Sequence, residues 1–129
     1  MIVLDSSAAV DYLISRERGE WVEQELVADG DVHVPHLIDV EITNALRNLV
    51  RRGELHERRA RGALEDLADL DVARYSHVEF LERIWQLRDN MTAYDATFVA
   101  LAEALGAPLL TTDDKLAHAP GIRAAIIAP

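Results

Sequence analysis

The sequence predicts an α/β fold, a three-layer α/β/α sandwich with a central parallel sheet. Short apolar runs bounded by turn residues alternate with longer segments whose apolar residues recur with a helical period. The apolar runs alternate little between apolar and polar residues, which is typical of parallel strands covered on both faces. The 129 residues contain no linker, repeat or low-complexity tract, so we expect a single domain over 1–129.

The order of these segments predicts each element. We expect strands at 2–4, 32–34, 108–110 and 124–127, with a weaker strand at 71–74. Ser6 or Ser7 is positioned to cap the first helix, and Thr92 to cap the last. In the segment 77–89, Leu81 and Trp85 are expected among the core residues. The predicted helices run over about 6–14, 37–52, 55–69, 77–89 and 93–105, and a further helix after the first carries Trp21, Val22, Leu26 and Val27.

Composition excludes several classes of protein. The chain has no cysteine, so disulfides and thiolate metal sites are absent. No stretch approaches the roughly 18 apolar residues that a membrane span requires, so we expect no membrane partner and a cytoplasmic location. The net charge of -10 argues against a generally basic nucleic-acid-binding surface.

Arginines nevertheless gather in one stretch of this acidic chain. The cluster consists of Arg47, Arg51, Arg52, Arg58, Arg59 and Arg61. One interpretation is a solvated helical hairpin. The other is a local arm that holds phosphates beside an acidic centre, and both stay open at this level.

Four carboxylates occupy positions that folding alone does not favour. Asp5 follows the first strand and Asp113 follows the apolar pair at 109–110. Glu41 and Asp95 border the apolar stripes of two predicted helices. Because ligands of open parallel sheets bind beyond the carboxyl ends of the strands, the four are candidates for one site.

Each acid also has a structural explanation. In the structural explanation, Asp5 is the N-cap of a helix, and Asp95 forms a capping box with the N-cap Thr92. Glu41 hydrogen-bonds within a helix pair, and Asp113 belongs to an ordinary turn with Asp114. These explanations are independent of one another, whereas a single metal site accounts for all four acids.

Oxygen ligands suit hard cations such as Mg²⁺ or Mn²⁺, which bind substrate phosphates and activate water. We therefore expect Asp5, Glu41, Asp95 and Asp113 to be both the metal ligands and the catalytic residues. The auxiliary candidates are Ser7, Asn44, Thr112 and Asp114, each of which is also explained as an ordinary cap or surface group.

The segments around these acids resemble the PIN-domain ribonucleases, and most closely the VapC-type toxins of bacterial toxin–antitoxin pairs. The resemblance runs over essentially the whole chain and rests on four motifs in order. They are Asp5-Ser6-Ser7-Ala8, Glu41-Ile42-Thr43-Asn44-Ala45-Leu46, Tyr94-Asp95-Ala96-Thr97-Phe98-Val99 and Leu110-Thr111-Thr112-Asp113.

The resemblance implies a Mg²⁺- or Mn²⁺-dependent endoribonuclease whose metal is held by Asp5, Glu41, Asp95 and Asp113. It also implies a homodimer, silenced by a cognate antitoxin protein in a toxin–antitoxin hetero-oligomer. With RNA as substrate, Arg47, Arg51 and Arg52 become candidates for binding its phosphates. The alternative is a catalytically silent PIN-like module that binds protein or RNA.

Overall fold

Five parallel strands form in the computed structural model, which describes residues 1–129. They are β1 (Ile2–Leu4), β2 (Val32–Pro35), β3 (Val72–Tyr75), β4 (Leu109–Leu110) and β5 (Ile126–Ile127). Their order in the sheet is β3-β2-β1-β4-β5, and each neighbouring pair is parallel. The predicted parallel sheet is confirmed, with the last two strands shorter than expected.

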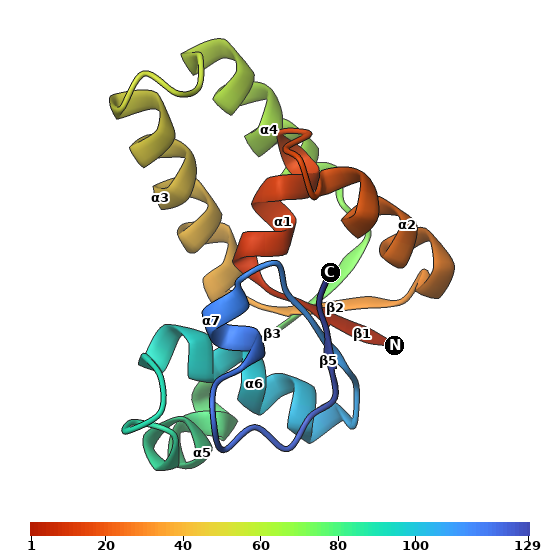
Figure 1. The fold of residues 1–129 in the computed structure, drawn as a ribbon, viewed down its shortest axis with the longest axis vertical. Helices are drawn as coiled ribbons and strands as arrows, with labels where there is room; N and C mark the ends of the chain where they lie inside the picture. The colour runs from red at the N-terminus through yellow and green to blue at the C-terminus, as the bar shows by residue number, and fades with distance from the viewer.

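Helices cover both faces of this sheet. They are α1 (Ser6–Leu13), α2 (Gly19–Asp29), α3 (Leu37–Arg51), α4 (Glu57–Asp69), α5 (Leu81–Gln86), α6 (Ala93–Leu105) and α7 (Asp114–Ala117), together with the 3₁₀ helix η1 (Val78–Phe80). Figure 1 shows α1 and α2 on one side of the sheet and α5 and α6 on the other, with α3 and α4 forming a projecting hairpin. The predicted three-layer α/β/α sandwich is therefore confirmed.

Helix ends follow the expected capping chemistry, with one correction. Asp5, and not Ser6 or Ser7, is the N-cap of α1, and its carboxylate accepts a hydrogen bond from the Ala8 N–H. Thr92 caps α6 by accepting from the N–H of Asp95, as predicted. The structural explanation for Asp5 thus holds. Only half of the predicted capping box forms at Thr92, because no hydrogen bond joins the Thr92 N–H to the Asp95 carboxylate.

The segment 77–89 differs from the prediction. It forms η1 and the short α5, and Leu81 and Trp85 are 54% and 66% exposed. Residues 81 and 85 lie one helical turn apart, on a face that adjoins the buried stripe of Ile84 and Leu87. The segment carries two apolar stripes with the same period, so periodicity alone does not identify the inner one.

The core is built around the middle strands and one helix. All of β1 and β4 is buried, and α6 is buried continuously from Ala96 to Ala102. A helix that is apolar on all sides belongs inside a protein, and α6 packs against β1, β2 and β4. This packing sets the start of α6, and with it Asp95, close to the strand ends. No helix in the structure combines the length and apolar character needed to cross a membrane.

Candidate metal and catalytic site

The order of the strands reverses beside β1, since β2 and β3 lie on one side of it and β4 and β5 on the other. In such sheets a crevice forms at the carboxyl ends of the strands where the order changes. Asp5 directly follows β1, and Asp113 comes three residues after β4. Two of the four predicted acids are therefore placed at this edge by the sheet itself.

Asp5 is the most buried of the four acids, with 4% of its surface exposed. Its carboxylate accepts hydrogen bonds from the Ala8 N–H at 2.9 Å, the Ser7 hydroxyl at 2.8 Å and the Thr111 hydroxyl at 2.5 Å. Burial raises the pKa of Asp5 to about 6, because these donors only partly offset the loss of water, and the charge of Asp113 adds to the rise. Asp5 is thus held rigidly in position.

Glu41 reaches the same region from the second turn of α3 and is half-buried. Its Oε1 accepts a long hydrogen bond of 3.5 Å from the Ser6 hydroxyl. Burial raises the pKa of Glu41 to about 7, with further contributions from the charges of Asp95 and Asp5. The charges of Asp95 and Asp5 therefore act on the carboxylate of Glu41.

Asp95 stands in the first turn of α6 and is also half-buried. Burial raises the pKa of this carboxyl, and the charge of Asp113 raises it further, while Lys115 lowers it. The charge of Asp95 in turn raises the pKa of Glu41.

Asp113 and Asp114 have different surroundings. Asp113 is half-buried, caps α7 by accepting from the Lys115 and Leu116 N–H groups, and raises the pKa of both Asp5 and Asp95. The Asp114 side chain is 71% exposed and lies 3.5 Å from an Arg18 nitrogen. Asp113 is thus the better placed of the two to be the fourth acid.

Together the four acids form a negatively charged cluster without a direct counter-ion. None of them takes part in any of the ion pairs of the structure. No three acidic or histidine side chains are positioned together to hold a metal ion.

Hydroxyl groups support the site differently from the prediction. Ser7 bonds to Asp5 as expected, but the Thr112 hydroxyl donates to Asp11 at 2.7 Å and to none of the four acids. Thr111, which the sequence analysis did not select, donates to Asp5 instead. The sequence does indicate Thr111, because residues 111 and 113 point to the same face of an extended chain.

The remaining predicted residues lie on α3 and its end. Asn44 is exposed and makes no side-chain hydrogen bond to the acids, so its auxiliary role stays a prediction. Arg47 and Arg51 are also exposed. Arg52 lines a pocket that also includes Ser6 and Ser7, and neither Arg47 nor Arg51 belongs to its lining.

Comparison with known proteins identifies the family. The model of the PIN domain matches residues 2–122. Ribonuclease VapC1 of Mycobacterium tuberculosis is 45% identical over 121 residues, covering 93% of this chain and 91% of that protein.

Two solved structures share the fold at lower identity. PAE2754 from Pyrobaculum aerophilum has a TM-score of 0.70 and 24% identity, covering 97% of this chain and 81% of that one. VapBC2 from Rickettsia felis, solved bound to a DNA fragment from its promoter, has a TM-score of 0.68 and 14% identity, covering 99% and 98%. The resemblance deduced from the four motifs is confirmed, and the chain belongs to the PIN-domain family, in its VapC ribonuclease group.

Proposed function

We propose that the protein is a metal-dependent endoribonuclease and the toxin of a toxin–antitoxin pair. The observation that carries this proposal is the cluster of Asp5, Glu41, Asp95 and Asp113 at the switch point of the sheet. Three of these carboxyls have a raised pKa, and none of the four has an ion-pair partner. Such a cluster destabilises the protein unless a cation neutralises it, which is the arrangement expected of a metal site.

The donor set suits Mg²⁺ or Mn²⁺. All four candidate ligands are carboxylates, the neighbouring groups are hydroxyls, and no histidine or cysteine stands among them. We propose that these four side chains would hold the cation. When bound, the cation supplies an activated water and neutralises charge on the phosphodiester being cut.

The residues around the proposed metal site have different roles. Ser7 and Thr111 hold Asp5 in a fixed rotamer, so that Asp5 anchors the site. Glu41 has only the long bond from Ser6 and remains free to reorient. Its pKa of about 7 means that the carboxyl binds a proton near neutral pH when no cation is present, and a bound cation would favour its charged form.

An antitoxin partner fits the charge of the chain. The net charge of -10 and the acidic cluster favour a partner segment that carries basic side chains. The structural neighbour VapBC2 is itself a complex, and a second neighbour, FitAB, was solved bound to a DNA fragment. We propose that a cognate antitoxin binds over the acidic edge and covers it.

A homodimer is also part of the proposal. Large apolar side chains are exposed on η1, α5 and the start of α6, where Val78, Trp85 and Tyr94 are 62%, 66% and 60% exposed. Exposed apolar side chains of this size often mark protein interfaces. This side of the molecule is therefore our candidate for the dimer contact.

The test is cleavage of RNA by the purified protein with Mn²⁺ or Mg²⁺. We expect cleavage by the wild type, loss of cleavage with EDTA, and loss of cleavage in Asp5→Asn and Asp95→Asn. Asp114→Asn is the matched control, since it removes one carboxylate charge from the same edge of the sheet. A well-folded wild type that binds the metal and RNA without cutting would instead support the silent binding module.

A further inference from the structure

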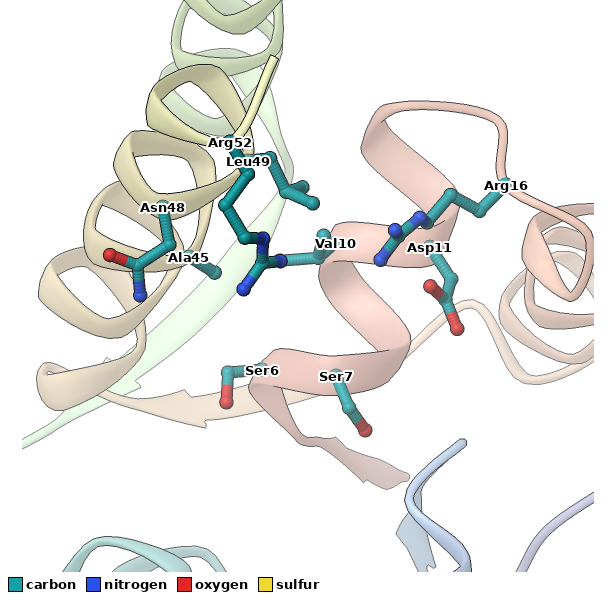
Figure 2. A pocket seen from close by; sticks show the side chains of 9 residues that line it. All are labelled: Ser6, Ser7, Val10, Asp11, Arg16, Ala45, Asn48, Leu49 and Arg52. Carbon is teal, nitrogen blue, oxygen red and sulfur yellow. The ribbon is translucent and has the colours of Figure 1, made fainter. Parts of the chain in front are cut away.

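A polar pocket of about 300 Å³ lies between α1, the turn after it and the end of α3. Its polar lining comes from Ser6, Ser7, Asp11, Arg16, Asn48 and Arg52. Figure 2 shows the guanidinium groups of Arg16 and Arg52 extending into this space from opposite walls. Two cations therefore face one pocket on a chain whose net charge is strongly negative.

These two arginines have spare hydrogen-bond donors. The Arg16 side chain makes no hydrogen bond or ion pair with any other group of the protein, and Arg52 makes one exposed contact of 3.3 Å with Glu54. Asn48 accepts from Arg47 through its Oδ1 at 3.2 Å, which leaves its amide N–H groups available. A guanidinium offers five donors in a planar fork, which matches the oxygens of a phosphate.

The one carboxylate of the lining does not cancel this charge. Asp11 Oδ2 accepts a 2.7 Å hydrogen bond from the Thr112 hydroxyl, on the side of the pocket away from α3. Neither arginine is paired with Asp11. The pocket therefore keeps its capacity to bind an anion.

The floor of the pocket is also the rim of the acidic cluster. Ser6 donates to Glu41, and Ser7 donates to Asp5 at 2.8 Å. An anion between Arg16 and Arg52 would therefore lie on the α1–α3 side of Asp5 and Glu41, separated from them by the two serines. A polynucleotide supplies such anions at regular spacing along its backbone.

We infer that this pocket holds a backbone phosphate of single-stranded RNA, next to the phosphodiester that is cut at the acids. Arg16 and Arg52 bind the phosphate oxygens, and Asn48 adds a neutral donor. This assignment rests on the proposed function for the identity of the ligand. It adds Arg16 and Asn48 as binding residues and fixes one direction in which the strand leaves the cleavage site.

The test compares RNA binding by matched variants in EDTA, so that it does not depend on cleavage. The probe is a short fluorescent single-stranded RNA of mixed sequence, and anisotropy is measured over a series of salt concentrations. Arg16→Gln/Arg52→Gln removes both pocket charges. Arg88→Gln/Arg123→Gln removes two exposed charges outside the pocket and outside the arginine cluster at 47–61, and is the control for net charge.

We expect the pocket variant to bind at least about tenfold more weakly. The slope of log K against log salt should become shallower by about 0.7, the value for one lost phosphate contact on a single strand. The control variant should keep the wild-type slope. Arg16→Lys/Arg52→Lys keeps both charges, so its slope should be close to that of the wild type. Thermal melting checks that each variant folds.

An unchanged slope in the pocket variant overturns the inference, as does a wild type that binds no RNA at low salt. If the slope is unchanged but an acidic peptide binds the wild type and not the variant, the pocket holds protein carboxylates, and the RNA assignment is wrong. If the wild type cleaves RNA but the slope of the pocket variant is unchanged, the assignment of the pocket is refuted and the proposed function is supported. If the slopes are as predicted but no RNA is cleaved, the proposed function is refuted and the assignment of the pocket is supported.

Discussion

The hydroxyl of Thr111 donates a 2.5 Å hydrogen bond to Oδ2 of Asp5, across 106 positions of sequence. This bond joins the ends of β1 and β4, the two strands at which the sheet order changes. The same oxygen of Thr111 accepts from the Asp113 N–H at 3.0 Å. Thr111 therefore links two of the proposed metal ligands through one buried atom.

Thr111→Val removes this link while nearly preserving the volume of the side chain. It leaves the Asp113 N–H without its partner and removes a donor that lowers the pKa of Asp5. We expect the free energy of unfolding to fall by about 1–3 kcal/mol and metal affinity to fall at least roughly tenfold. Urea unfolding and a Mn²⁺ titration measure the two effects.

Thr43→Val serves as the control, because the Thr43 hydroxyl bonds only to a carbonyl of its own exposed helix. Thr111→Ser should behave like the wild type. Wild-type metal affinity in Thr111→Val would refute a positioning role for Thr111.

The metal-free protein should lose stability as pH rises from about 4 to about 7. The pKa of Asp5 is raised from 3.8 to about 6, so between these values the folded state binds more protons than the unfolded state. The free energy of unfolding then decreases with pH, by about 3 kcal/mol for a shift of this size. Glu41 extends the decrease toward pH 7.

Thermal melting in EDTA over this range measures the effect. Asp5→Asn should flatten the curve between about pH 4 and pH 6, whereas Asp114→Asn should retain it with the same change of net charge. Rising stability of the wild type over this range would contradict the raised pKa of Asp5.

Asp113 and Asp114 should differ sharply in their effect on cleavage. Asp113→Asn should lower the cleavage rate by at least about a hundredfold, because one carboxylate of the metal site is lost. Asparagine still caps a helix, so α7 should remain intact. Asp114→Asn should cleave at close to the wild-type rate. The opposite ranking would make Asp114 the fourth acid.

Trp85→Glu should convert a dimer into a monomer if the exposed face of α5 is the dimer contact. Trp85 is 66% exposed, so the change should leave the fold and its melting temperature nearly unaltered. Sedimentation velocity measures the change of mass. Val27→Glu, at an exposed apolar position on α2, is the control and should leave the mass unchanged. If the wild type, Trp85→Glu and Val27→Glu all have the same mass, the exposed face of α5 is not the dimer contact.

The sequence was sufficient to predict the positions of the four candidate acids, because these positions depend on strand order and helix period. Asp5 and Asp113 could be placed because the carboxyl ends of parallel strands meet at one edge. Glu41 and Asp95 could be placed because an acid on an apolar stripe must face the protein.

The remaining parts depend on how the helices pack. Arg16 and Asn48 meet only because the turn after α1 lies opposite α3, and nothing local in the sequence indicates this contact. Leu81 and Trp85 were wrongly predicted to be core residues, since their stripe has the same helical period as that of the buried Ile84 and Leu87. Thr111 was overlooked in favour of its neighbour Thr112, although its register with Asp113 pointed to the same face.

The most direct test of the central claim, that four acids form one metal site, is calorimetric titration with Mn²⁺. The wild type should bind Mn²⁺ and release protons near pH 6, because cation binding favours the charged carboxylates. Asp5→Asn, Glu41→Gln, Asp95→Asn and Asp113→Asn should each weaken binding by at least about tenfold, and Asp114→Asn should not. Failure of the wild type to bind Mn²⁺ at millimolar concentration, or equal binding by all four variants, would contradict the account.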